Sequence, residues 1–292
     1  RKGYSLKIIV AKDAGYCFGV RHAVDQAYKT TKKHGDVYML GHIVHNENVV
    51  KDLEKSGTKV VDSLDQVPSN KPLLFRAHGT EPNIWEQARK KKLNIIDATC
   101  PLVTEIHEEV RRLEKDGRQI IIIGDHGHDE IVGISTQVKN PIIISDAKEA
   151  QQLKKMKRVG VVSQSTQMIE NIQNIISVLL TKVSDLHFVN TICFPTKRNH
   201  EQIKKLAQTA DILIIIGSFT SANSKRLTQL ALERNPRSYQ VTNVRDIKNE
   251  WFTEAETVGI SAGASTPDNI IQDVIQHVKK IGNVINEEII YE

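Results

Sequence analysis

The chain has 292 residues, of which 39% are apolar and 26% are charged, a composition typical of a globular protein with one large domain or two to three small ones. No apolar run approaches the roughly 18 residues that a membrane-spanning helix needs, which excludes a protein with transmembrane helices. The net charge of +5 favours anionic ligands or an acidic protein partner, and three widely spaced cysteines exclude a disulfide framework.

Apolar strand-like runs alternate with amphipathic helical segments along the whole chain. Runs rich in Ile, Val and Leu predict strands at 6–10, 73–77, 119–124, 158–163, 211–217 and 257–261. Near-continuous apolar runs indicate strands that are buried on both faces, and their alternation with helices indicates parallel sheets. The sequence therefore predicts an α/β fold. Lysine pairs and triplets in or beside these helices are typical of solvated faces, and no nucleic-acid recognition motif accompanies them.

Three cysteines repeat one local pattern, because Cys17, Cys100 and Cys193 each follow a strand-like run and precede an amphipathic helix. They are separated by 83 and 93 residues. The same two offsets relate three further sets of residues, namely Gly41, Gly124 and Gly217; His45, His128 and Ser221; and Glu47, Glu130 and Asn223. This self-similarity predicts three α/β repeats around a pseudo-threefold axis.

The repeats divide the chain into segments of roughly 80 to 95 residues. We expect the first repeat at 18–100, the second at 101–192, and the third from 1–17 together with 193–281. Residues 282–292 form a C-terminal tail. Each repeat has a second strand–loop–helix unit, and the loops of these units carry His78, Ser163 with Ser165, and Ser265.

All of these polar loops follow the carboxyl ends of predicted strands, where open α/β sheets bind their ligands. If the repeats face one another, the three cysteines converge at one central cavity, and a cation is then needed to neutralise their thiolates. Three thiolates leave one metal position open, whereas closed zinc sites and most iron–sulfur clusters have four protein ligands. Thiolate ligands favour an iron–sulfur cluster, and zinc is the alternative.

The loop histidines and hydroxyl groups predict an anion site. His45, His128 and Ser221 share a repeat position at the start of a helix, and such donors suit a diphosphate. Glu130 is predicted either to be a helix N-terminal carboxylate or to be a proton donor beside the metal. His22 and His107 lie on the helices that follow Cys17 and Cys100, and we expect both to face solvent.

The residues as a set resemble the 4-hydroxy-3-methylbut-2-enyl diphosphate reductase family of the non-mevalonate isoprenoid pathway. The segments that carry the resemblance are GYCFGVRHAV, HNENVV, RAHGTEP, DATCPLVT, GHDEIVG, SQST, TIC, GSFTSANSKRL and SAGASTPD. They run from about residue 7 to residue 281 in the order and spacing of that family. Four features depart from it. Ser165 stands where a threonine is usual, and Ala222 stands where many members have serine. TKRNH at 196–200 replaces a more usual pattern with Arg-Gln, and the tail beyond residue 281 is short.

The resemblance implies a three-domain trefoil and a reductive dehydration that yields isopentenyl and dimethylallyl diphosphate. It implies a 4Fe–4S cluster on Cys17, Cys100 and Cys193, with one iron that no cysteine ligates and that binds the substrate oxygen. The residues that it assigns to the diphosphate are His45, His78, His128, Ser221, Asn223 and Ser265. Glu130 delivers protons, and Ser165 belongs to the relay.

The partners implied are an allylic diphosphate substrate and a small electron-transfer protein, either a ferredoxin or a flavodoxin, with no nucleic acid and no membrane. The expected location is the bacterial cytoplasm, or the plastid stroma if a transit peptide precedes Arg1. Two other functions use the same residues. One is a zinc-dependent diphosphate hydrolase, and the other is a cluster-based redox or iron sensor without enzymatic activity.

Overall fold

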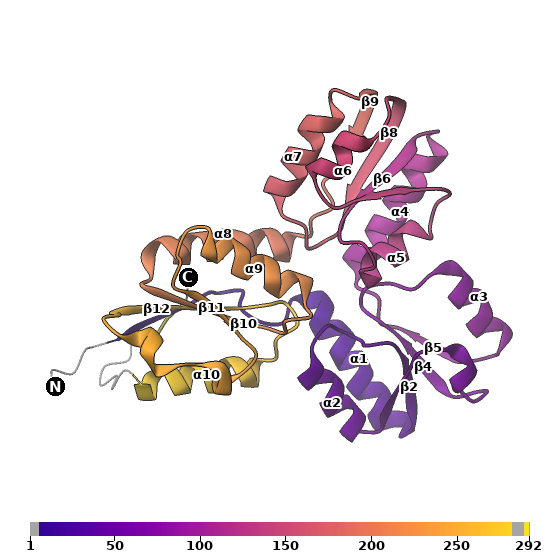
Figure 1. Cartoon of the computed structure of the whole chain (residues 1–292). Helices are drawn as coiled ribbons and strands as arrows, with labels where there is room; N and C mark the ends of the chain where they lie inside the picture. The colour runs from indigo at the N-terminus through magenta and orange to yellow at the C-terminus, as the bar shows by residue number, and fades with distance from the viewer. Residues whose placement is uncertain (1–5, 282–288, 292) are drawn as a thin grey trace. The chain divides into compact units, whose positions relative to one another are not determined.

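The computed structural model describes residues 6–281 and 289–291, and these residues form three parallel sheets with helices between their strands (Figure 1). Within this part of the chain no helix combines the length and the apolar character needed to cross a membrane. The predicted α/β fold with three repeated sheets is confirmed.

The first sheet has the strand order β3-β2-β4-β5. Its strands are β2 (Val37–Leu40), β3 (Thr58–Val61), β4 (Pro72–Phe75) and β5 (Asn94–Asp97). The helices around them in the sequence are α1 (Phe18–His34), α2 (Glu47–Lys55), the 3₁₀ helix η1 (Leu64–Gln66) and α3 (Pro82–Lys90). A capping box at Ser63 and Gln66 fixes the start of η1.

The second sheet has the order β7-β6-β8-β9. Its strands are β6 (Gln119–Ile123), β7 (Ile142–Ile144), β8 (Met156–Ser163) and β9 (Val183–Phe188). The helices are α4 (Pro101–Lys115), α5 (Asp129–Ser135), α6 (Ala147–Gln152) and α7 (Ile169–Leu179). α4 begins with proline at its first position, where the missing N–H group would have no helical partner.

The third sheet has the order β11-β10-β12-β1-β13. Its strands are β1 (Lys7–Val10), β10 (Ile212–Ile216), β11 (Ser238–Val241), β12 (Thr257–Ala262) and β13 (Ile289–Tyr291). The helices are α8 (Phe194–Thr209), α9 (Ala222–Leu232), η2 (Val244–Asp246), η3 (Asn249–Phe252) and α10 (Asp268–Ile281). Only β13 of the predicted tail 282–292 is described; the other tail residues lie outside the described part of the chain.

The three sheets share one topology, in which the first strand lies between the second and the third, and a fourth strand follows the third. β1, from the start of the chain, takes the fourth place in the third sheet. A glycine follows the first strand of each sheet, and its N–H group donates to the last residue of the second strand. These bonds run from Gly41 to Val61 (2.9 Å), from Gly124 to Ile144 (3.0 Å) and from Gly217 to Val241 (2.8 Å).

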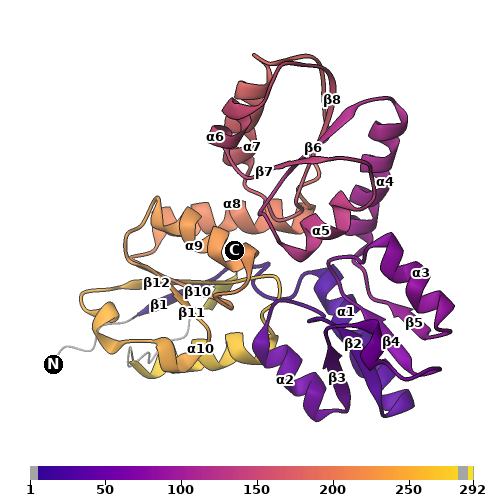
Figure 2. The ribbon, with the colours of Figure 1, turned by 45° about the vertical axis from the view of Figure 1, so that its right-hand side comes forward.

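Apolar cores cover both faces of the second sheet, as its near-continuous isoleucine run predicts. Ile121 and Ile123 pack in one core with residues of α6 and α7. Ile120 and Ile122 pack in another with residues of α4 and α5. The alternation follows from the period of two along a strand. Figures 1 and 2 show α8 and α9 on one face of the third sheet and α10 on the other.

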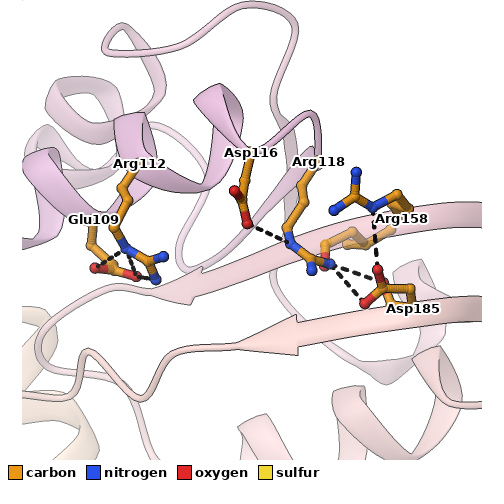
Figure 3. Close-up of polar contacts among 7 residues, drawn as sticks. Glu109, Arg112, Asp116, Arg118, Arg158 and Asp185 are labelled. Carbon is orange, nitrogen blue, oxygen red and sulfur yellow. Dashed lines mark hydrogen bonds and ion pairs between the residues drawn. The ribbon is translucent and has the colours of Figure 1, made fainter.

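Ion pairs tie β9, an edge strand of the second sheet, to its neighbours (Figure 3). The Asp185 carboxylate accepts from Arg118 (2.9 Å) and from Arg158 (3.2 Å), so it joins β9 to β8 and to the turn before β6. The pKa of Asp185 is lowered, and the main cause is the hydrogen bond that it accepts from Arg118. Arg112 and Glu109 form a separate pair on α4.

By compactness the chain divides into two units. Unit 1 consists of described residues within 1–20, 45–49 and 194–292, and contains the third sheet. Unit 2 consists of residues 21–44 and 50–193, and contains the first and second sheets. The predicted repeat boundaries at residues 17, 100 and 192 stay a prediction.

Candidate functional site

All eleven predicted site residues follow the carboxyl end of a strand, as parallel strand–loop–helix units predict. Those in unit 2 are His78, Cys100, His128, Glu130, Ser165 and Cys193. Those in unit 1 are Cys17, His45, Ser221, Asn223 and Ser265. Each unit therefore carries at least one cysteine together with hydroxyl or imidazole groups.

Glu130 and Ser165 form a buried pair in unit 2. Glu130 lies in the first turn of α5 and is 2% exposed, while Ser165 lies in the loop after β8. The backbone N–H of Ser165 donates to Glu130 Oε1 at 2.6 Å, and its hydroxyl donates to Oε2 at 2.8 Å. Two donors from one residue fix the carboxylate group in position and make the serine hydroxyl its immediate proton-exchange partner.

Two histidines lie beside this pair. The backbone N–H of Glu130 donates to His128 Nδ1 at 3.1 Å, so the ring of His128 caps α5. Because Nδ1 accepts, a neutral His128 carries its ring proton on Nε2. The rings of His78 and His128 meet edge to face with their centroids 5.7 Å apart. The loops after β4 and β6 thus bring two of the three predicted diphosphate-binding histidines together.

Backbone hydrogen bonds join the two cysteines of unit 2 to the same loops. The N–H of Cys100 donates to the carbonyl of Ala77, next to His78, at 3.0 Å. The N–H of Cys193 donates to the carbonyl of Ser165 at 2.9 Å. A continuous series of contacts therefore runs from Cys100 through the two histidines, Glu130 and Ser165 to Cys193.

His107 contradicts its prediction. It was expected to face solvent, but it is 7% exposed and packs against the backbone of Gly79 and Gly133. Burial, with a further contribution from the Arg111 charge, lowers the pKa of His107 to about 4, so the imidazole is neutral at pH 7. His22 is exposed, as predicted.

In unit 1, hydrogen bonds connect the loop after β12 both to Cys17 and to His45. The N–H of Cys17 donates to the carbonyl of Ala264 at 3.3 Å. The hydroxyl of the next residue, Ser265, donates to the carbonyl of His45 at 3.1 Å. Glu47, the repeat equivalent of Glu130, accepts from the hydroxyl of Ser218 at 2.7 Å.

Ser221 and Asn223 lie at the start of α9. Ser221 is the N-cap, and its hydroxyl accepts from the N–H of Ser224 at 3.3 Å. Asn223 is 7% exposed, and its amide nitrogen and oxygen have no hydrogen-bond partner among the described residues. Buried amides are normally hydrogen-bonded, so the amide of Asn223 has donors and an acceptor to offer to a ligand or to a water molecule.

The sequence interpretation missed an ion pair between two site loops. Arg76, two residues before His78, pairs with Asp129, the neighbour of Glu130, at 2.9 Å. The hydroxyl of Ser163, at the end of β8, contacts the hydroxyl of Thr191 at 3.2 Å. Only the charge of Arg76 and Asp129 marked them in the sequence, and charges are common in loops.

Residues 8–279 match the LytB protein family. The chain belongs to this family. A relative from Geobacter sulfurreducens, named 4-hydroxy-3-methylbut-2-enyl diphosphate reductase, is 38% identical over 279 residues, which cover 95% of this chain and 99% of the relative. A relative of the same name from Anaplasma marginale is 36% identical, and the match covers 95% of this chain and 84% of the relative.

A solved structure agrees with the LytB assignment. The E-1-hydroxy-2-methyl-but-2-enyl-4-diphosphate reductase of Plasmodium falciparum superposes with a TM-score of 0.90 at 28% identity, covering 94% of this chain and 88% of that one. The resemblance predicted from the sequence is confirmed, and with it the prediction that the chain belongs to a family of reductases.

Proposed function

We propose that this LytB chain reduces (E)-4-hydroxy-3-methylbut-2-enyl diphosphate to isopentenyl diphosphate and dimethylallyl diphosphate with the help of a 4Fe–4S cluster. The reaction consumes two electrons and two protons, breaks one C–O bond, forms one C–H bond and releases water. The observation that carries the proposal is the buried Glu130–Ser165 pair, held between His128 and the cysteine-bearing loop.

The three cysteines fit such a cluster. Cys17, Cys100 and Cys193 are half-buried, and each directly precedes or caps a helix, where the helix dipole favours a thiolate. We assign them as the three ligands of one cluster. When bound, it supplies electrons one at a time, and its iron without a cysteine ligand offers a Lewis acid for the hydroxyl group of the substrate.

We assign diphosphate binding to His45, His78, His128, Ser221, Asn223 and Ser265. The unpartnered amide of Asn223 supports the assignment, since a phosphate oxygen would accept from it. The tautomer of His128 supports it as well, because Nε2–H remains a donor while Nδ1 caps α5.

Glu130 delivers a proton to the departing hydroxyl group. Its carboxyl group is fixed by Ser165 and screened from solvent, so a proton on it is directed rather than exchanged with bulk water. The hydroxyl of Ser165, which donates to Oε2, can relay a proton to Glu130 when its oxygen takes up another proton at the same time. A serine in place of the usual threonine keeps this hydroxyl group.

The proposal is tested on anaerobically purified protein. We expect about four iron and four sulfide per chain, and conversion of the allylic diphosphate to both products when methyl viologen supplies electrons. Glu130→Gln keeps shape and hydrogen bonding but cannot release a proton, so turnover at saturation should fall about a hundredfold with binding retained. Glu149→Gln, which removes a carboxylate on α6 that is held by His126, is the matched control.

Two results would contradict this assignment. Stoichiometric zinc without iron, together with release of phosphate, would favour the zinc-dependent hydrolase instead. Turnover of Glu130→Gln close to that of the unaltered protein, with its cluster intact, would move the acid to another group.

A further inference from the structure

Two exposed phenylalanines stack on each other in unit 1. Phe18 is 44% exposed and Phe194 is 50% exposed, and their rings are parallel within 7° with centroids 5.8 Å apart. Single exposed apolar side chains are common, but a stacked pair forms a flat apolar patch of the kind that protein partners cover. Phe18 and Phe194 are the first residues of α1 and α8, directly after Cys17 and Cys193.

A positive charge is held over this patch. The guanidinium group of Arg198 lies 5.3 Å from the centroid of the Phe194 ring and pairs with Asp13 at 3.1 Å. Gln202 fixes Asp13 in turn, by donating to its carboxylate at 2.5 Å and accepting from its N–H at 3.0 Å. Arg198 is thereby kept in a fixed position although its side chain is 55% exposed.

The surroundings of the pair are basic. α8 carries four Lys and Arg residues against a single glutamate, Glu201. Lys12 and Lys197, the sequence neighbours of Asp13 and Arg198, are exposed. Aromatic rings with arginine beside them are the side chains that contribute most to protein interfaces, and a basic surround selects an acidic partner. A second copy of this chain would bring like charges together.

We infer that Phe18, Phe194 and Arg198, with Lys12 and Lys197 around them, form the docking surface for an acidic one-electron carrier protein. The inference rests on the proposed function, since a cluster on Cys17 and Cys193 would lie one residue from each ring. Electron transfer weakens steeply with distance, so a carrier must dock close to the group that it reduces. Two successive encounters, each oxidising one carrier by one electron, supply the two electrons of a turnover.

The test measures binding directly. An oxidised acidic [2Fe–2S] ferredoxin and an oxidised flavodoxin are each immobilised, and the holo-protein is titrated over them by biolayer interferometry. Phe194→Ala and Arg198→Glu should each raise the Kd of the bound carrier about tenfold or more. Added salt should raise the Kd of the unaltered protein and change that of Arg198→Glu less. Leu232→Ala and Lys248→Glu, an exposed apolar and an exposed basic residue elsewhere in unit 1, should change it less than twofold.

Reduction by methyl viologen, which needs no docking, separates this inference from the proposed function. Equal rates of bleaching of the visible absorption in all variants would show that each holds an intact cluster. Failure of the unaltered protein to convert the allylic diphosphate with viologen would count against the proposed function alone. Unchanged carrier Kd in both Phe194→Ala and Arg198→Glu, no binding of either carrier, or a Phe194-dependent dimer in light scattering would overturn the docking surface.

Discussion

His107 fills the space that two glycines leave beneath the loop of His78. A Cβ atom at Gly79 would lie 2.7 Å from Cε1 of His107, and one at Gly133 would lie 3.5 Å from Nε2. Gly79 adjoins His78, and Gly133 belongs to α5, the helix that carries Glu130. The imidazole of His107 therefore supports two site loops from below, and its protonation state bears on their stability.

We expect His107 to make the protein acid-sensitive. Its pKa in the folded protein is about 4, below the usual value, so the unfolded chain takes up the proton first as the pH falls. The free energy of unfolding should be unaffected above about pH 6.5 and should fall below it, by at most about 1.4 kcal/mol per pH unit down to about pH 4.

His107→Gln removes this titration, and urea unfolding at pH 7, 6 and 5 measures it. The variant should lose stability at neutral pH because the ring no longer packs on the glycines, but its further loss between pH 6.5 and 5 should be smaller than that of the unaltered protein. His22→Gln, an exposed histidine on α1, should follow the unaltered protein. Parallel pH curves for His107→Gln and the unaltered protein would contradict the prediction.

The places of Cys17, His78 and His128 after a strand could be predicted from the sequence because each follows a strand with a clear apolar run, at β1, β4 and β6. His107 could not be placed by residue type, since a lone histidine in a helix is usually solvated. The helical spacing of apolar residues around His107 could have predicted that its side chain is buried. Val103, Ile106, Val110 and Leu113 line the buried face of α4, and His107 lies on that face between them.

At the scale of the element, one strand–glycine–loop–helix unit starts each sheet. In the second and third sheets the glycine is also required by close packing. A Cβ atom at Gly124 would lie 2.2 Å from Cδ1 of Ile131, and one at Gly217 would lie 2.1 Å from Oγ of Ser224. Ile131 and Ser224 are separated by 93 residues, the same offset that relates the two glycines, so the contact itself is repeated.

Gly124→Ala should push Ile131, and with it the neighbouring Glu130, away from the strand end. We expect a loss of about 1–3 kcal/mol in the free energy of unfolding, the usual scale of overpacking, together with slower turnover. In an Ile131→Ala background, Gly124→Ala should lower the free energy of unfolding much less. The remaining close contact is then with the end of the Gln164 side chain, which can move. Chemical unfolding of the four proteins measures this coupling, and strictly additive losses would show that the glycine is needed for another reason.

The inner strands other than β2 were predictable because covered strands are apolar along their whole length, as in β6 and β10. The second strands of the sheets, β3, β7 and β11, were not predicted. They lie at sheet edges and are three or four residues long, and β11 reads SYQV. An edge strand needs fewer apolar residues to be stable, so its sequence resembles that of a loop.

At the scale of the whole molecule, the residues assigned to the cluster and the substrate are divided between the two compact units. Cys17 and His45 belong to unit 1, and Cys100, Cys193 and His128 belong to unit 2. The offset of 83 residues that relates His45 to His128 places the same side chain at the same repeat position in different units. These two histidines are therefore a matched pair with which to ask whether both units bind one substrate.

If one diphosphate contacts both units, His45→Ala and His128→Ala should weaken it alike. Each change removes a hydrogen bond to a charged group, worth about 1.5–3 kcal/mol, so we expect a loss of roughly ten- to a hundredfold in affinity. Calorimetric titration with the substrate diphosphate and with inorganic pyrophosphate measures it, with His22→Ala as the control and visible absorption as the check on the cluster. A loss confined to His128→Ala would mean that unit 2 alone binds the diphosphate, and His45 would then lose its assigned role.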